Sequence, residues 1–394
     1  MAVAIATGTQ DTETNLADEH VVDMDPKIGM KQDDTAQFMT ILNKLPSRSA
    51  NQVKCNWLED EYMPIQSTLA SGSITAAGQV NISVAAGEGA YFRVNDVLYL
   101  EASGEKVLIT AISTDAMTIT RSIGGVAAAT AASGTGVLLV GNASPQGADT
   151  GTLKATKRVL GYNYSEIFRN PAGFTGTEAE AELYGANDPA REIAKKAVEH
   201  RRLIEGALWV GGRDFVSSPA PAATASQGFM GGVSEFLTSN VFSTFGALSL
   251  SGFDVKIQQI MQQGSLEKVI FAAPTPAGAL SRLAANNWVM ADENVDVYGA
   301  KVNFFVSGAY GTRLPVIVKR EWGAYGSSLF GLGGAIFVLD LQRLSRRPFR
   351  NRDTRLLPNR QGNGEDKVVF DYLTETSFEL KNESAHGVFW GVTA

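Results

Sequence analysis

The sequence predicts an α+β fold into which one small all-β module is inserted. Residues 189–210 repeat apolar side chains at helical spacing, and residues 228–344 alternate between helical and strand-like patterns. Residues 74–148 instead hold short alternating runs rich in Ala, Gly, Thr and Val, and they contain no Trp. Because the period of the apolar residues is the main signal that separates helix from strand, these three segments define the fold class.

The composition fits a protein that buries much of its surface against other protein. Hydrophobic residues make up 44% of the 394 residues, which is enough for real cores, but charged residues make up only 19%. Globular proteins usually carry about 25%. The net charge of −7 argues against a dedicated nucleic-acid binder, because such chains are usually basic.

The cysteine content and the length of the apolar runs restrict the cellular compartment of the protein and the kinds of segment that it can contain. Cys55 is the only cysteine, which excludes an intramolecular disulfide and fits a reducing compartment. Residues 1–20 lack the basic start and apolar core of a secretory signal. No apolar run approaches the length of a membrane span, so no membrane segment is expected.

The elements follow in order from the N-terminus. Residues 1–32 are acidic and aperiodic, which predicts an extended arm. The apolar spacing from Phe38 to Leu45 predicts a short helix ended by Pro46. In the inserted module, alternating runs predict the strands of a small β-barrel or sandwich at 81–84, 96–100, 106–110, 117–120 and 136–140.

The longest predicted element begins at Asp188-Pro189, where Asp is a good N-cap and Pro suits the first helical position. Gly211-Gly212 ends it. Beyond it, helices are expected at 254–263 and 275–285. Strands are expected at 268–273, 303–306, 314–318 and 335–341, followed by a closing antiparallel set at 368–373, 376–381 and 387–392.

Most residues that could carry chemistry have a simpler interpretation. Ser265 and Lys268 match the Ser-x-x-Lys pattern of serine acyl enzymes, but they lie where a helix gives way to a strand, so a chance match is expected. His20, His200 and His386 show no paired metal spacing, and His200 is expected to be solvated or at an interface. No glycine run is followed by the Lys-Ser/Thr of a phosphate loop. We therefore expect no catalytic residue, metal or cofactor.

The strongest charge feature is an arginine segment, residues 343–360, whose arginines are Arg343, Arg346, Arg347, Arg350, Arg352, Arg355 and Arg360. It could bind phosphate backbones, pair with carboxylates of neighbouring subunits, or be a solvated loop. The absence of Lys favours pairing, because the planar guanidinium binds carboxylates bidentately. The acidic arm and the acidic run Glu59, Asp60 and Glu61 are plausible partners.

Five phrases, taken in order, resemble the tailed-phage major capsid proteins of the Hong Kong 97 fold, in the branch with a β-insert in the extended loop. They are Asn56–Pro64, Tyr162–Arg169, Glu199–Gly211, Gly228–Phe236 and Asn382–Gly387. The resemblance covers most of residues 33–394. It implies an N-terminal arm and short helix (1–45), an extended loop (46–176) interrupted by the β-insert (74–148), the spine helix of a peripheral domain (177–212), an axial domain (213–345) and the closing strands of the peripheral domain (346–394).

The same resemblance implies a structural role and not catalysis. Hexamers and pentamers of the chain would form an icosahedral shell around viral double-stranded DNA, contacted without sequence specificity. Scaffold, portal and decoration proteins are possible partners, the host cytoplasm is the expected place of assembly, and the virion is the final location. An encapsulin-type compartment shell is the alternative with the same fold. A soluble Ser-Lys hydrolase is the alternative from another class.

Overall fold

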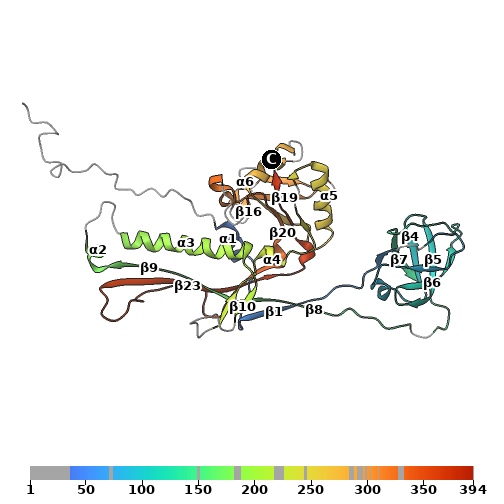
Figure 1. The fold of residues 1–394 in the computed structure, drawn as a ribbon, viewed down its shortest axis with the longest axis horizontal. Helices are drawn as coiled ribbons and strands as arrows, with labels where there is room; N and C mark the ends of the chain where they lie inside the picture. The colour runs from blue at the N-terminus through green and yellow to red at the C-terminus, as the bar shows by residue number, and fades with distance from the viewer. Residues whose placement is uncertain are drawn as a thin grey trace, which may run out of the picture. The chain divides into compact units, whose positions relative to one another are not determined.

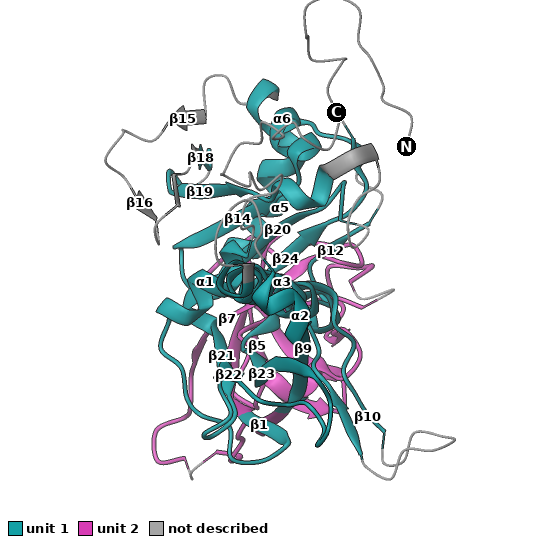
Figure 2. Ribbon diagram, turned by 90° about the vertical axis from the view of Figure 1, so that its left-hand side faces the viewer, with its two compact units in different colours: residues 1–57, 161–394 teal, residues 58–160 magenta. Residues whose placement is uncertain are grey.

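The computed structural model describes residues 36–70, 74–148, 151–181, 188–216, 226–243, 246–283, 288–290, 296–297, 300–301, 303–308, 310–326 and 332–393. The acidic arm at 1–32 lies outside them. The chain forms two compact units (Figures 1 and 2). Unit 1 comprises Met1–Trp57 and Gly161–Ala394, and unit 2 comprises Leu58–Leu160. Each unit has its own hydrophobic core.

Unit 2 is built around a six-stranded sheet with the order β2-β7-β4-β5-β6-β3. A bridge between Leu69 and Val84 joins the two outer strands and closes the sheet into a barrel. The five strands expected in this region are confirmed, and β2 adds a sixth that lies wholly before residue 74. The strands are β2 (Gln66–Thr68), β3 (Asn81–Ser83), β4 (Asp96–Leu100), β5 (Glu105–Ser113), β6 (Ala116–Ile123) and β7 (Gly136–Asn142).

A buried ion pair lies beside the core of this barrel. Glu105 is fully buried on β5, and Arg121 on β6 binds both of its carboxylate oxygens. The same guanidinium donates to the carbonyl oxygens of Ala77 and Ala129, at 3.1 and 2.6 Å. Arg121 therefore ties two loops to the barrel wall, because one planar donor group supplies bonds in several directions.

The long helix is the central element of one part of unit 1. Helix α3 (Asp188–Val210) lies along strands β9 (Glu166–Thr175) and β23 (Lys367–Leu380), as Figure 1 shows. Strands β21 (Leu344–Pro348) and β22 (Arg355–Leu357) also pair with β23. The expected helix is confirmed, whereas the two strands expected at 368–373 and 376–381 are one continuous strand. Residues 374–376 do not interrupt it, because β9 and β21 supply its backbone partners.

A seven-stranded sheet forms the other part of unit 1, with the order β12-β24-β20-β14-β19-β18-β15. Its strands are β12 (Val241–Phe242), β14 (Lys268–Ala272), β15 (Trp288–Met290), β18 (Asn303–Val306), β19 (Arg313–Val318), β20 (Ile336–Asp340) and β24 (Gly387–Phe389). Helices α5 (Leu250–Met261) and α6 (Pro274–Leu283) are near the expected positions. The prediction that 387–392 closes an antiparallel set with β23 is wrong, because β24 pairs with β20 and β12 instead.

Short elements complete the described chain. They are α1 (Gln37–Lys44), α2 (Gly176–Glu180), α4 (Val233–Phe236), η2 (Glu88–Tyr91), η3 (Arg320–Gly326), η5 (Leu341–Arg343), η6 (Glu383–Ala385), and the strand pairs β1 (Lys54–Glu59) with β8 (Val159–Tyr164), β10 (Asp214–Val216) with β11 (Gln227–Phe229), β13 (Gly246–Ala247) with β25 (Val392–Thr393), and β16 (Asp296–Val297) with β17 (Ala300–Lys301). Helix α1 confirms the short helix expected before Pro46.

An aromatic cluster joins α1, α3 and η3. The rings of Phe38 and Trp209 lie 4.3 Å apart, and Trp209 meets Trp322 edge-on at 4.8 Å. All three side chains are fully buried, and such ring pairs add stability beyond the apolar area that they bury. The cluster therefore fixes the N-terminal helix on the rest of unit 1.

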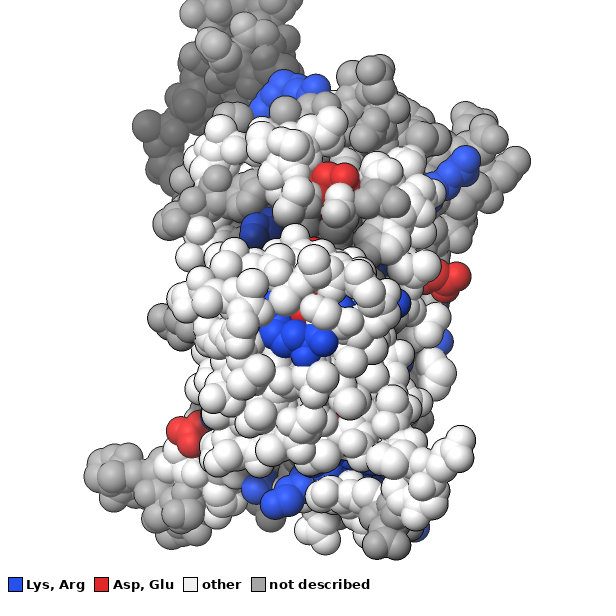
Figure 3. Space-filling model, turned by 90° about the vertical axis from the view of Figure 1, so that its right-hand side faces the viewer, with Lys and Arg blue, Asp and Glu red and all other residues white. Residues whose placement is uncertain are grey.

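One face of the molecule is poor in charge, as the composition suggests. Charged side chains are few and scattered on the face shown in Figure 3, and most of that face is neither acidic nor basic. Among the described residues, no helix is both long enough and apolar enough to cross a membrane.

Candidate functional site

The arginine segment begins at η5, continues through β21 and a turn, and includes β22. Its side chains divide into two groups. Arg346 and Arg347 are buried, at 5% and 7% exposure, and Arg352 is half-buried. The other four, Arg343, Arg350, Arg355 and Arg360, are exposed. The segment is therefore partly structural and partly available at the surface.

The three less exposed arginines bind carboxylates of their own chain. Arg346 pairs with Asp353 and donates to the Asn43 side chain at 2.9 Å. Arg347 pairs with Glu379 on β23 at 3.0 Å. Burial alone would raise the pKa of Asp353, but the Arg346 guanidinium and nearby hydrogen bonds hold that pKa below its ordinary value. These contacts fix the segment on β23 and on the end of α1.

Arg352 forms the third internal pair, with Glu375 on β23. The predicted intersubunit role of the arginines thus stays a prediction, and it now applies most directly to the exposed Arg343, Arg350 and Arg355.

The acidic run Glu59, Asp60 and Glu61 makes a contact within unit 2. Asp60 lies 3.6 Å from Arg158, and both side chains are more than half exposed, so this pair contributes little. Glu59 and Glu61 are its neighbours in the run.

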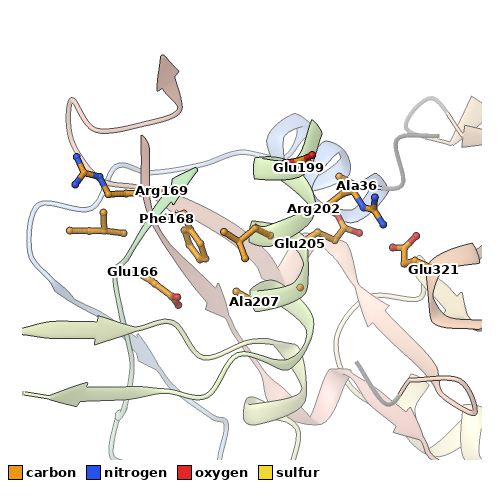
Figure 4. Close-up of a pocket in the computed structure, with 12 residues that line it drawn as sticks. Ala36, Glu166, Phe168, Arg169, Glu199, Arg202, Glu205, Ala207 and Glu321 are labelled. Atoms are coloured by element: carbon orange, nitrogen blue, oxygen red, sulfur yellow. The ribbon is translucent and has the colours of Figure 1, made fainter. Parts of the chain in front are cut away.

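A pocket lies between α3 and β9 (Figure 4). Its wall includes Ala36, Glu166, Phe168, Glu205 and Glu321. Glu166 is mostly buried and accepts one hydrogen bond, from the backbone N–H of Met230 at 2.9 Å. Burial raises the pKa of Glu166 above its ordinary value, only partly opposed by that bond.

Glu205 connects the pocket to the core. Its carboxylate accepts the backbone N–H groups of Phe38 and Met39 at 3.1 and 2.8 Å, and it pairs with Lys319. The first N–H groups of a helix have no partner within the helix, so Glu205 satisfies two such donors of α1. Lys319 also binds Glu321 at 2.7 Å. No local pattern predicts this cluster, because Glu205 is one of several polar residues on a long helix.

The Ser-x-x-Lys match has a structural explanation. The ammonium of Lys268 donates to the carbonyl oxygens of Gln263 and Ala385 at 2.9 and 2.7 Å, and it lies 4.0 Å from Asp340. The hydroxyl of Ser265 donates to the Glu267 carbonyl at 3.4 Å. Burial lowers the pKa of Lys268 to about 8, while Asp340 opposes the shift. Lys268 is thus held by groups other than the Ser265 hydroxyl.

Two of the three histidines are buried, and His20 lies outside the described residues. His200 is fully buried against Thr374 (2.8 Å), so the prediction of a solvated or interface position is wrong; strand β23 covers this face of α3. His386 accepts the backbone N–H of Asp340 at 3.1 Å. Within the described chain, no group of three or more His, Cys, Asp or Glu could hold a metal ion.

His386 predicts a loss of stability in mild acid. Burial lowers its pKa to about 4, and an unfolded histidine titrates near about 6.5. As pH falls from about 6.5 towards 4, the unfolded chain takes up a proton that the folded chain does not, so the free energy of unfolding falls by up to roughly 2–4 kcal/mol. Burial shifts the pKa of His200 in the same direction.

Urea unfolding at pH 7 and pH 5 measures this effect in the parent and in His386→Asn. The variant should lose less stability than the parent between the two pH values, even if it starts lower at pH 7. Equal losses in the two proteins would contradict the assignment to His386. The matched variant Asn382→Ala, at the start of η6, should keep the parent's pH dependence.

Comparison with known protein families identifies the family to which the chain belongs. The family model described as SU10 major capsid protein matches residues 6–393. No curated protein matches the chain. The match spans almost the whole sequence and includes all five phrases that carry the resemblance to major capsid proteins.

Similar solved structures include a native GTA capsid, with 9% identity, 96% coverage of each chain and a TM-score of 0.49. The cyanophage A-1(L) capsid has 10% identity, with 98% of this chain and 99% of that chain covered and a TM-score of 0.48. The holo-SrpI encapsulin complex from Synechococcus elongatus PCC 7942 has 11% identity, with 60% and 78% covered and a TM-score of 0.43. From the match over residues 6–393, the chain belongs to the SU10 major capsid protein family and is a structural subunit of a virion shell.

Proposed function

We propose that this chain assembles as hexamers and pentamers into an icosahedral shell that encloses the double-stranded DNA of a tailed phage. The observation that carries the proposal is the family match over residues 6–393. The charge-poor composition supports it, because a shell subunit buries much of its surface against neighbours. The exposed arginines at 343, 350, 355 and 360 are available for such contacts.

We also propose a structural role for each segment of the subunit. Residues 1–45 serve as the N-terminal arm and short helix, and 46–176 as the extended loop that carries the β-insert at 74–148. Residues 177–212 and 346–394 form the peripheral domain, and 213–345 the axial domain. The separate core of unit 2 supports an insert that folds as its own module. The length of α3 supports its role as a spine.

The contacts of Ser265 and Lys268, which match the acyl-enzyme pattern, are consistent with a non-enzymatic role. Lys268 gives its hydrogen bonds to backbone carbonyls, which leaves the Ser265 hydroxyl without an adjacent amine base. An acylating probe should therefore not label Ser265. The family match also favours a viral capsid over a compartment shell.

The proposed partners are further copies of the chain, non-specifically contacted DNA, and separate scaffold, portal and decoration proteins. Assembly takes place in the host cytoplasm, and the mature location is the virion. These partners and places follow from the capsid role.

The test is to express the chain alone and with any scaffold protein encoded beside it, and to image the products by negative-stain electron microscopy. Closed shells of uniform size are the expected result. Particles from infected cells should protect DNA from nuclease. Uniform shells that hold protein cargo and no DNA would favour the compartment alternative. A soluble monomer under all conditions would refute the shell role.

A further inference from the structure

The loop between β22 and β23, residues 358–366, contains the only Asn-Gly dipeptide of the sequence, Asn363-Gly364. Both residues are exposed, and so are the residues on either side of them. Asparagine is one of the thermally labile residues, because its side-chain amide can be lost. The nitrogen of the following residue is the atom that can attack this amide, so the surroundings of Gly364 decide whether Asn363 is stable.

A tight turn presents the dipeptide to solvent. The N–H of Glu365 donates to the Gly362 carbonyl at 3.3 Å, which closes a four-residue turn with Asn363 and Gly364 at its centre. Gly364 has a φ of +86°, the value expected for the third residue of a type II turn, where glycine fits without steric cost. The Glu365 carboxylate also accepts the Gly362 N–H at 2.8 Å. The ends of the turn are therefore held, while its two central residues stay exposed.

The backbone nitrogen of Gly364 is accessible. Among the residues that the structure describes, its N–H has no hydrogen-bond partner. A Cβ built on Gly364 would meet no other atom within 4 Å, so no neighbouring group crowds this position. The side-chain amide of Asn363 belongs to the preceding residue, and a bond from the Gly364 nitrogen to its carbonyl carbon closes a five-membered ring. The nucleophile and the carbon that it can attack are thus both open to solvent.

Two other asparagines in the same part of the chain lack this arrangement. Asn351 and Asn359 are also exposed, and both have positive φ values, +60° and +56°. Each is followed by an arginine, whose side chain crowds the backbone nitrogen. The N–H groups of Arg352 and Arg360 also donate to backbone carbonyls at 2.9 and 2.8 Å. Exposure is therefore shared by the three asparagines, but the free backbone nitrogen belongs to Asn363-Gly364.

We propose that Asn363-Gly364 is a self-modifying site, at which asparagine is converted to aspartate and isoaspartate with water as the co-reactant. The Gly364 nitrogen loses its proton to the solvent and attacks the side-chain carbonyl carbon of Asn363. The new N–C bond replaces the bond to the side-chain nitrogen, which takes up a proton and leaves as ammonia. Water then opens the cyclic imide at either carbonyl, and nothing is oxidised or reduced. The proposal does not depend on the proposed shell function.

The modification changes both the charge and the backbone of the loop. Either product places a new carboxylate beside Glu365 and Asp366, and Glu365 is already paired with Lys367 at 3.0 Å. Isoaspartate also adds one carbon to the main chain, so the N–H of Glu365 no longer matches the carbonyl of Gly362. Copies of the chain therefore come to differ with age in the charge and the turn of this loop.

Peptide mapping of the full-length chain tests the site. The purified chain is stored at neutral pH and then digested in heavy-oxygen water, so that any conversion during digestion carries the heavy isotope. The expected result is a progressive loss of the Asn363 amide, with isoaspartate detected by an isoaspartate-specific methyltransferase, while Asn351 and Asn359 keep their amides. Asn363→Gln is the matched variant. It keeps an exposed amide but needs a six-membered ring, so it should lose no amide over the same period.

Three outcomes would overturn the proposal. The first is an Asn363 amide that lasts as long as those of Asn351 and Asn359. The second is equal loss at all three positions, because exposure alone would then set the rate and the free Gly364 nitrogen would have no part in it. The third is conversion found only in product that carries the heavy isotope, which would assign the change to the digestion and not to the protein.

Discussion

Replacing Glu205 by Ala is expected to lower the free energy of unfolding by about 3–5 kcal/mol, the usual cost of removing one partner from a buried ion pair. The substitution removes one carboxylate partner of Lys319, which is fully buried and also pairs with Glu321. It also removes the acceptor for the N–H groups of Phe38 and Met39. Helix α1 should therefore separate from α3 before the rest of unit 1 unfolds.

Chemical denaturation measures the loss, and hydrogen exchange at residues 37–44 reports on α1. Glu199→Ala is the matched control on the same helix. Glu199 is half exposed and pairs with Lys195 and Lys196, so its removal should change stability by no more than about 0.5 kcal/mol. If the two variants are equally stable, Glu205 does not hold α1. If Glu205→Ala is unstable but exchange in α1 is unchanged, the effect lies in the Lys319 pair alone.

Replacing Arg121 by Ala is the second large effect, and it should be confined to unit 2. Glu105 is fully buried and would lose its only ion-pair partner among the described residues, which costs about 3–5 kcal/mol. The carbonyls of Ala77 and Ala129 lose their donor as well. Burial opposes ionisation of Glu105, but its Arg121 and backbone hydrogen bonds prevail and hold the pKa of this carboxyl below its ordinary value.

Because that pKa is lowered, the pair stabilises unit 2 at neutral pH, and this contribution is lost as pH falls through the folded-state pKa. Hydrogen exchange within residues 74–148 should rise strongly in Arg121→Ala while protection in the seven-stranded sheet stays unchanged. Lys106→Ala, at an exposed position on β5, is the matched control and should behave like the parent. Equal loss of protection in both units would contradict an independent core in unit 2.

The local sequence predicts elements whose pattern is long and regular. Helix α3 and strands β3 to β7 of unit 2 have clear periods and turn residues at their ends, so their predicted and observed positions are close. Strand β9 was missed, because Asn170-Pro171 and Gly173 are ordinary turn signals. In the structure, Asn170, Pro171 and Gly173 pair with Tyr372, Asp371 and Val369 of β23, respectively. A partner two hundred positions away in the sequence overrides the local preference.

The sequence identifies the arginine segment as a candidate site, but it does not predict the contacts or the exposure of each arginine. The density of arginines identified the segment, yet nothing local distinguishes Arg347, bound to Glu379, from Arg350, which is exposed. That difference depends on pairing at long range, because Arg347 lies in β21, which pairs with β23, whereas Arg350 lies in the turn that follows. Glu205 and Lys319 lie 114 positions apart. Single-sequence patterns contain no information on such a pairing.

The pairing of β9 with β23 has a consequence for the order in which the chain can fold during synthesis. Residues 166–175 pair with residues 367–376, so the two-stranded ribbon beside α3 cannot close until residue 376 has been translated. Unit 2 is contiguous, and its barrel can form as soon as residue 142 leaves the ribosome. At about 5–20 residues per second, the main fold then waits roughly 10–50 seconds for its final strand. Until then, a nascent chain lacks the finished sheet of β9 and β23 and the surface that this sheet presents.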